Sequence, residues 1–308
     1  MSERKALLTV DGLCRSFRYG KEELRAVDGV SFEIYEGEAF GLVGESGCGK
    51  TPTGRTVIGL YPPTRGQIFF RDELIAEAGK SKKRKSDARI QMIFQDPIAS
   101  LDGRMTVRDI IAEGLVISGV RDRQVINERV YEMLSYVGLL PEHASRYPHE
   151  FSGGQRQRIG IARALIMKPE LIIADEPVSA LDVSVQAQII NLLSRLKKEL
   201  GTAILFIAHD LSVVKYFCDR IGVMYMGKLL ETASSKELFE NPLHPYTRSL
   251  LSAIPYPDPR YDKARNWLIF DPGESKESFE SGKMQEVCEG HFVLCTDEEL
   301  ERYIKIRE

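Results

Sequence analysis

The sequence contains no apolar stretch long enough to cross a lipid bilayer. A membrane-spanning helix needs about 20 consecutive, mostly apolar residues, whereas charged residues make up 28% of this chain and break up its apolar runs. The first ten residues also lack the apolar core of a signal peptide. We therefore expect the protein to remain where it is synthesised and to reach any membrane through a partner protein.

Cysteine and excess positive charge are also scarce. A net charge of −3 argues against general nucleic-acid binding, which usually needs a basic surface. Cys288 and Cys295 are the one close pair, and two thiols fall short of the four ligands of a structural metal site or a cluster. We interpret both as ordinary thiols. The odd number of scattered cysteines favours a reducing compartment over a disulfide framework: Cys14, Cys48, Cys218, Cys288 and Cys295.

A glycine-rich segment with the spacing G-x-x-x-x-G-K-[ST] follows the apolar run Ala39–Val43 and precedes a helical pattern at Gly54–Leu60. A turn of this kind between a strand and a helix aims backbone N–H groups at one point, where the helix dipole also favours negative charge. Lys50 would reach the β- and γ-phosphates of a nucleotide, and the Thr51 hydroxyl would lie on Mg²⁺. The segment predicts a phosphate-binding loop made of Gly44, Glu45, Ser46, Gly47, Cys48, Gly49, Lys50 and Thr51.

Pro52 departs from this pattern because it directly follows Thr51, where another backbone N–H normally holds the α-phosphate. Proline has no N–H, although its backbone angle suits the first turn of a helix. A hydrogen bond to a charged group is worth roughly 1.5–3 kcal/mol. We expect nucleotide binding to be weakened but not abolished.

The apolar run Leu171–Ala174 ends in two adjacent acids, Asp175 and Glu176. A buried strand would bring Asp175 to the sheet edge beside the phosphate loop, where it can hold Mg²⁺ through the water shell of the ion. Side chains alternate along a strand, so Glu176 points elsewhere, toward the position of an attacking water. We assign Glu176 the role of general base or water-positioning group.

Short apolar strands alternate with amphipathic helices after the loop, which predicts a mainly parallel α/β sheet. The strands are expected at Ile90–Phe94, Leu171–Ala174 and Ala203–Ala208, and a hairpin at Ile221–Tyr225 and Lys228–Glu231. Helices are expected over Glu128–Val137 and Val185–Leu200.

Three other regions differ from this alternating pattern. Short segments at Leu7–Val10, Val30–Ile34 and Gln67–Arg71 suggest antiparallel strands laid against the nucleotide core. Residues 98–167 are helix-rich and predict a helical subdomain, while the basic run Lys80–Lys85 reads as a solvated loop. We place an ATPase domain at 1–243 and a C-terminal extension at 244–308 that carries one short helix, Tyr246–Ala253.

A second set of exposed helix N–H donors is expected where Phe151-Ser152-Gly153-Gly154-Gln155 opens the helical run Arg156–Met167. A helix start of this kind can bind an anion. Two phosphate-binding helix starts in one chain suggest a dimer in which both subunits hold each nucleotide.

The order of these motifs, together with Gln95, Asp182 in Ser-Ala-Leu-Asp and His209, resembles the nucleotide-binding subunits of ABC transporters over roughly residues 7–255. The resemblance implies bound ATP and Mg²⁺, with Gln95 touching the ion and the attacking water and His209 contacting the γ-phosphate. Asp182 would lie at the dimer interface. The resemblance also implies that Ser152, Gly153, Gly154 and Gln155 form a signature motif, which caps the γ-phosphate of the nucleotide bound to the partner subunit. Phe17, with Tyr19 second, would stack on adenine.

Finer similarity points to the ATPases of oligopeptide and dipeptide importers. Ala26–Phe32, Phe94–Pro97, Tyr147–Glu150 and Asn241–Tyr246 carry it. It implies permease transmembrane subunits, a second ATPase subunit in a homo- or heterodimer, indirect contact with a substrate-binding protein, and a peripheral position on the cytoplasmic face of the membrane.

Three alternatives remain open at this point. The chain could be a soluble ABC ATPase of translation or DNA repair, although it has neither two cassettes nor a long coiled-coil insertion. It could bind nucleotide without hydrolysing it, since Pro52 weakens one site. It could also serve an importer of a metal chelate, an opine or an antimicrobial peptide.

Overall fold

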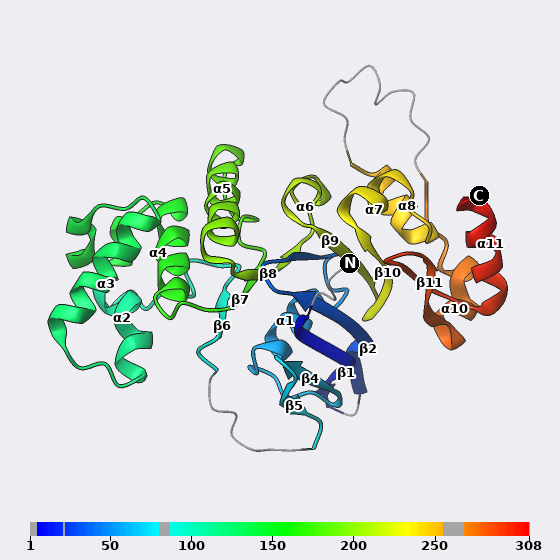
Figure 1. Cartoon of the computed structure of the whole chain (residues 1–308), viewed down its shortest axis with the longest axis horizontal. Helices are drawn as coiled ribbons and strands as arrows, with labels where there is room; N and C mark the ends of the chain where they lie inside the picture. The colour runs from blue at the N-terminus through cyan, green and yellow to red at the C-terminus, as the bar shows by residue number, and fades with distance from the viewer. Residues whose placement is uncertain (1–4, 21, 80–86, 255–267, 308) are drawn as a thin grey trace.

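The computed structural model describes residues 5–20, 22–79, 87–254 and 268–307 of the 308-residue chain. The basic run Lys80–Lys85 lies outside the described residues. Figure 1 shows a central sheet with helical elements at one end, a separate antiparallel sheet below it, and the C-terminal elements at the other end. Among the described residues, no helix combines the length and apolarity needed to cross a membrane.

Four antiparallel strands form the smaller sheet, in the order β2-β1-β4-β5. Their pairing confirms the antiparallel strands expected from the N-terminal part of the sequence, although the first two are much longer than expected. The inward side chains, among them Leu8, Val10 and Ile68, are fully or almost fully buried. The strands are β1 (Ala6–Tyr19), β2 (Glu22–Tyr35), β4 (Arg65–Phe70) and β5 (Glu73–Glu77).

The larger sheet has eight strands in the order β11-β12-β10-β9-β3-β8-β7-β6. The five neighbouring strands β9-β3-β8-β7-β6 are parallel, as expected, and read as almost continuous apolar runs because both faces are covered. The carboxyl ends of these strands meet at one edge, where they deliver the candidate site. The parallel strands are β3 (Ala39–Val43), β6 (Ile90–Ile93), β7 (Leu171–Asp175), β8 (Ala203–Ala208) and β9 (Arg220–Tyr225).

Helices cover the sheet and build a lobe beyond its β6 end. Residues 98–167 contain three α-helices and two 3-10 turns, in agreement with the expected helical region, and their apolar faces pack into one buried cluster with the sheet. These elements are α2 (Val107–Ile117), α3 (Arg123–Tyr136), η1 (Pro141–Ser145), η2 (Pro148–Glu150) and α4 (Gly153–Leu165). The helices that cover the sheet include α1 (Lys50–Val57), α5 (Val183–Leu200) and α6 (Leu211–Phe217).

The C-terminal part corrects one expectation. The expected short helix forms as α8 (Pro245–Ser252), but the expectation that the extension carries only this helix is wrong. Among the described residues, two further α-helices and two strands follow it, and β12 (His291–Cys295) pairs antiparallel with β10 (Lys228–Ser234) and thereby extends the main sheet. Val293 is fully buried at this pairing, and Cys295 is fully buried where β12 pairs with the preceding strand, which explains why β12 forms although it is only five residues long. The remaining elements are α7 (Ser235–Glu240), α8 (Pro245–Ser252), η3 (Pro272–Ser275), α10 (Lys276–Ser281), β11 (Lys283–Cys288) and α11 (Asp297–Arg307).

Candidate functional site

The phosphate loop lies between β3 and α1, as the sequence predicts, and its backbone needs glycine at specific places. Gly44, Gly47 and Gly49 have φ angles of 148°, 81° and 108°. A Cβ atom on Gly44 would lie 2.1 Å from the Met224 carbonyl oxygen, and one on Gly49 would lie 2.3 Å from that of Ala26. The loop is therefore pressed against neighbouring backbone, and larger residues would displace it.

Lys50 begins α1 and is almost fully buried, at 4% exposure. Its ammonium donates hydrogen bonds of 2.7 Å and 2.8 Å to the carbonyl oxygens of Gly44 and Glu45. These two acceptors belong to the loop itself, so the positive charge is held directly over the turn. This is the place where the phosphates of a nucleotide would bind.

Thr51 and Asp175 meet beside the loop. The Thr51 hydroxyl donates a 2.8 Å hydrogen bond to Asp175 Oδ1, and Oδ2 is buried without a hydrogen-bond partner among the described residues. Burial raises the pKa of the Asp175 carboxyl, although the Thr51 hydrogen bond and the Arg55 guanidinium 3.8 Å away oppose this shift. A buried carboxylate oxygen without a hydrogen-bond partner, next to a hydroxyl, fits the oxygen ligands that Mg²⁺ prefers.

Glu176 follows Asp175 with a left-handed backbone angle, φ 44°. Its Oε2 atom accepts a 2.8 Å hydrogen bond from Gln95 Nε2 and lies 3.4 Å from His209 Nδ1. These three residues come from the loops after β6, β7 and β8, so the three parallel strands bring them together. The sequence separates Gln95 from Glu176 by 81 positions.

One pocket of about 430 Å³ unites the loop with these side chains. Pro52 also lines it, in the first turn of α1 as expected. The Thr53 hydroxyl does not replace the missing donor, because it bonds to the Gly49 carbonyl oxygen at 2.9 Å. The lining residues are Ser46, Gly47, Gly49, Lys50, Thr51, Pro52, Gln95, Glu176 and His209.

The expected second anion site lies outside this pocket. Ser152 caps α4, and Ser152 and Gln155 exchange hydrogen bonds of 3.0 Å and 3.4 Å between side chain and backbone. Ser152, Gly153 and Asp182, which precedes α5, are exposed to solvent. None of these residues lines the nucleotide pocket of their own chain.

Phe17, expected to stack on adenine, lines a separate pocket with Arg15 and Thr64. The Arg15 guanidinium lies 4.5 Å from the centre of the Phe17 ring, and Tyr61 packs edge-on at 5.2 Å. Neither Phe17 nor Arg15 is among the residues that line the phosphate pocket. The side chain of Tyr19, the second candidate, lies outside what the structure describes.

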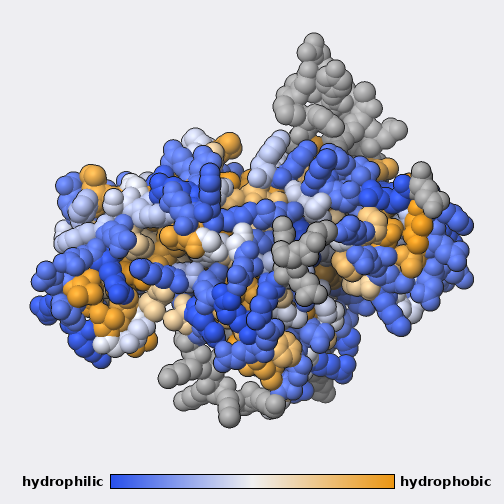
Figure 2. Space-filling model, in the orientation of Figure 1, coloured by the Kyte–Doolittle hydropathy of each residue, from blue (hydrophilic) through white to orange (hydrophobic). Residues whose placement is uncertain are grey.

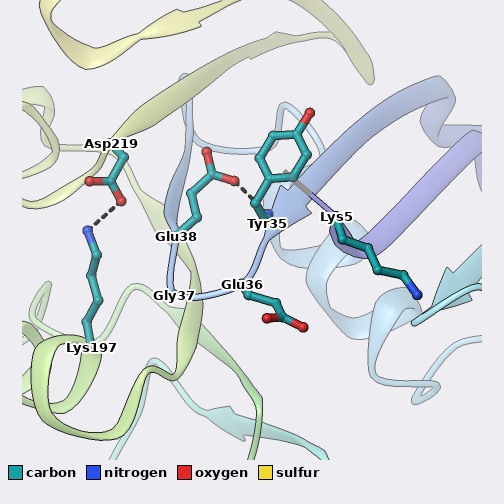
Figure 3. A pocket seen from close by; sticks show the side chains of 7 residues that line it. All are labelled: Lys5, Tyr35, Glu36, Gly37, Glu38, Lys197 and Asp219. Carbon is teal, nitrogen blue, oxygen red and sulfur yellow. Dashed lines mark hydrogen bonds and ion pairs between the residues drawn. The ribbon is translucent and has the colours of Figure 1, made fainter. Parts of the chain in front are cut away.

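A further pocket, shown in Figure 3, lies at the opposite edge of the sheet, where β3 begins. Asp219 accepts a 2.7 Å hydrogen bond from the Ala39 N–H and also pairs with Lys197. Glu38 accepts a hydrogen bond from the Tyr35 N–H at 2.8 Å and pairs with Arg220. Because the polar groups satisfy one another, we interpret this pocket as structural.

Two residues near the pocket were not predicted from the sequence. Arg55 approaches Asp175, and the hydroxyl of Tyr246 accepts a 3.2 Å hydrogen bond from the Glu45 N–H in the phosphate loop. Arg55 could have been found, because it lies one turn after Thr51 on the same helix. Nothing in the local sequence indicates that Tyr246, 201 positions after Glu45, reaches the loop.

Comparison with protein-family models finds two matches. Residues 27–179 match the ABC transporter family, which covers the phosphate loop, Gln95 and Glu176. Residues 230–276 match the C-terminal region of oligopeptide/dipeptide transporters. The second match includes Tyr246.

Curated relatives cover nearly the whole chain. It is 56% identical over 301 residues to the oligopeptide transport ATP-binding protein OppF of Bacillus subtilis. The match covers 96% of this chain and 98% of OppF. It is 50% identical to the dipeptide transport ATP-binding protein DppF of Lactococcus lactis, with 99% of both chains covered.

Among solved structures, the chain is similar to cbiO1 of Clostridium perfringens, part of the ABC transporter complex cbiONQ, with a TM-score of 0.67 and 29% sequence identity. The match covers 77% of this chain and 92% of cbiO1. It is also similar to the ATP-binding cassette MJ0796 in a dimeric post-hydrolysis state bound to ADP and Pi, with a TM-score of 0.67 and 26% sequence identity. This match covers 74% of this chain and 98% of MJ0796. The chain therefore belongs to the ABC transporter ATPases, and among them to the family of oligopeptide/dipeptide transport ATP-binding proteins.

Proposed function

We propose that this chain hydrolyses ATP to energise import of oligopeptides or dipeptides through a membrane permease. The observation that carries the proposal is the meeting of Gln95, Glu176 and His209 over the phosphate loop in one pocket. The peptide cargo is supported by the relatives, which are named as oligopeptide and dipeptide transport proteins and match this chain at 50–56% identity.

ATP binds through Lys50, the N–H groups of the loop and the N-terminus of α1, all of which favour negative charge. Thr51, Asp175 and Gln95 would hold Mg²⁺, which when bound neutralises charge on the phosphates. Glu176 orients the attacking water and accepts its proton, since its carboxylate is anchored by Gln95 and His209 on one oxygen. His209 steadies the γ-phosphate.

A second ATPase subunit completes the site. The start of α4 is exposed and does not line the pocket of its own chain, while the bonds between Ser152 and Gln155 hold its shape. In the proposed dimer, Ser152, Gly153, Gly154 and Gln155 face the nucleotide held by the partner, with Asp182 at the interface. The dimeric state of the similar cassette MJ0796 supports this arrangement.

The permease subunits are the proposed membrane partners, and they place this chain on the cytoplasmic face of the membrane. Apolar residues gather over the helical lobe in Figure 2. Among residues 98–167, Ile98 and Ile117 are 63% and 78% exposed. Ile98 lies three positions after Gln95, and exposed apolar residues of this kind suit docking of a permease segment, because burial of apolar surface favours association. A substrate-binding protein would act through the permease, without touching this chain.

The other hypotheses lose support. The relatives are transport ATP-binding proteins, which argues against a role in translation or DNA repair. The catalytic side chains are assembled in the pocket, so a nucleotide-binding subunit without hydrolysis is not favoured.

The test is uptake into liposomes that contain the permease, this chain, its companion ATPase and the binding protein. ATP-dependent uptake of a labelled tetrapeptide is expected, and it should vanish when the chain is left out. ATP-dependent uptake of an iron chelate or an opine without peptide uptake would overturn the peptide assignment and leave the ATPase role intact.

A further inference from the structure

The C-terminal region reaches the phosphate loop through one hydrogen bond. Tyr246 lies in the first turn of α8, and its hydroxyl accepts the N–H of Glu45 at 3.2 Å. The Tyr246 side chain is 2% exposed, so water does not compete for this contact. A hydrogen bond that joins residues 201 positions apart fixes the loop against a different part of the fold.

The Tyr246 ring is held on more than one side. It packs against Tyr225 of β9 at 4.5 Å between ring centres and edge-on against Phe270 at 5.4 Å. Aromatic contacts in this range favour a defined ring orientation. Burial also raises the pKa of the Tyr246 hydroxyl, so the group stays neutral at physiological pH.

A buried carboxylate fixes the turn that places Tyr246. Glu231 is fully buried, and its two oxygens accept the N–H groups of Leu243 and His244 at 2.8 Å and 3.0 Å. The Nδ1 atom of His244 in turn accepts the N–H of Tyr246 at 3.1 Å, which caps α8. His291 Nε2 lies 2.7 Å from the same carboxylate and ties β12 to it. This network of buried hydrogen bonds therefore fixes the position of Tyr246 at the start of α8.

On the loop side, the Glu45 residue is held at both its N–H and its carbonyl group. Its carbonyl oxygen accepts hydrogen bonds from Lys50 Nζ at 2.8 Å and from the Cys48 N–H at 3.3 Å. The Lys50 ammonium lines the pocket, so a phosphate would compete with the Glu45 carbonyl oxygen for it. Tyr246 is not among the residues that line the pocket, so a nucleotide there would not displace its hydrogen bond to Glu45.

We propose that Tyr246 is a positioning residue that preorganises the phosphate loop for nucleotide, which makes the C-terminal region part of the ATP-binding apparatus. A loop that is ordered before binding loses less entropy when the ligand arrives, so affinity rises. The effect is the same for ATP and ADP because both use the loop. It rests on ATP binding by this family and not on the peptide cargo.

The test is Tyr246→Phe, which removes the hydroxyl and keeps the ring between Tyr225 and Phe270. The dissociation constants for MgATP and MgADP are expected to rise together by about threefold to tenfold, the worth of one ordinary hydrogen bond. The KM for ATP should rise by the same factor. The kcat should stay unchanged, because Glu176, Gln95 and His209 are untouched.

Tyr225→Phe is the matched control, since it removes a hydroxyl from the same aromatic cluster and, among the described residues, that hydroxyl has no hydrogen-bond partner. Its nucleotide affinities should equal those of the unmodified chain. The proposal is overturned if Tyr246→Phe leaves both dissociation constants unchanged, if Tyr225→Phe weakens binding as much, or if only kcat falls. Thermal unfolding of both nucleotide-free variants shows whether they fold alike, and peptide uptake plays no part in the readout.

Discussion

The hydroxyl of Thr51 donates a 2.8 Å hydrogen bond to Asp175, which joins the first turn of α1 to the carboxyl end of β7. The two residues are 124 positions apart, and Asp175 is fully buried. The second carboxylate oxygen has no hydrogen-bond partner among the described residues. The fold thus keeps a desolvated acid beside the phosphate loop, an arrangement that a cation would satisfy.

Asp175→Asn is expected to separate binding of the ion from binding of the nucleotide. The amide keeps the shape and the bond to Thr51 but loses the charge, so Mg²⁺ affinity in the presence of ATP should fall by about tenfold to a hundredfold. ATP binding in EDTA should be unchanged or tighter. Titration calorimetry with and without Mg²⁺ measures both. An unaltered Mg²⁺ dependence would contradict this role for Asp175.

Pro52→Thr should tighten nucleotide binding. The substitution restores an N–H in the first turn of α1, and one more hydrogen bond to a charged phosphate corresponds to about tenfold to a hundredfold in affinity. Both ATP and ADP should gain, because both carry the α-phosphate. Pro62→Ala, outside the pocket, is the control and should leave both dissociation constants unchanged. Equal affinities for the Pro52→Thr variant and the unmodified chain would show that other donors already hold the α-phosphate.

His244 predicts a pH dependence of stability. Burial lowers the pKa of His244 to about 4, although the neighbouring Glu231 and Glu299 carboxylates oppose the shift. The folded state disfavours protonated His244. The contribution of neutral His244 to the free energy of unfolding is therefore fully present above the ordinary pKa near 6.5 and is lost as the pH falls toward 4. Between pH 7.5 and pH 5 the loss is on the order of 2 kcal/mol.

Urea unfolding of the nucleotide-free chain at the two pH values measures this effect. The matched variant is His244→Asn, because asparagine also caps helices but does not titrate. The variant should lose less stability between pH 7.5 and pH 5 than the unmodified chain, by about 2 kcal/mol. Identical losses in both proteins would assign the pH dependence to other groups.

Gly154 is expected to be required for the contact between α4 and α5. A Cβ atom at this position would lie 2.5 Å from Cγ1 of Val185, so Gly154→Ala should destabilise the fold by about 1–3 kcal/mol. Val185→Ala removes the clashing methyl group and should restore part of the loss in the double variant. Urea unfolding of the four proteins gives the coupling energy, and purely additive effects would rule out the steric explanation.

The catalytic side of the site could be predicted from the sequence because its residues follow strands with clear patterns. Leu171–Asp175 is an apolar run that ends in acids, and parallel strands bring their carboxyl ends to one edge, so Asp175 and Glu176 were expected to meet the phosphate loop. His209 was expected there only from the resemblance to a known family. The structure confirms their meeting, although the roles of these residues stay predictions. A local pattern sufficed for Asp175 and Glu176 because both acids lie at the carboxyl end of a recognisable buried strand.

The C-terminal part could not be predicted in this way. The strand β12 is stabilised by pairing with β10 and by burial of Val293, which no local pattern of five residues reveals. The contact of Tyr246 with Glu45 depends on a carboxylate, Glu231, that fixes a turn from another strand. Such contacts are set by tertiary packing between segments far apart in the chain.

The central claim is that Glu176 makes this chain an active ATPase, and Glu176→Gln tests it most directly. Phosphate release should be measured with the chain assembled with its permease, beside Glu170→Gln, which changes an acid at the other end of the same strand, where it pairs with Arg71. Turnover in Glu176→Gln should fall by at least about a hundredfold while ATP binding persists, as expected for loss of a general base, and Glu170→Gln should stay active. Turnover that survives in Glu176→Gln, or that is absent in the unmodified assembly, would contradict the account.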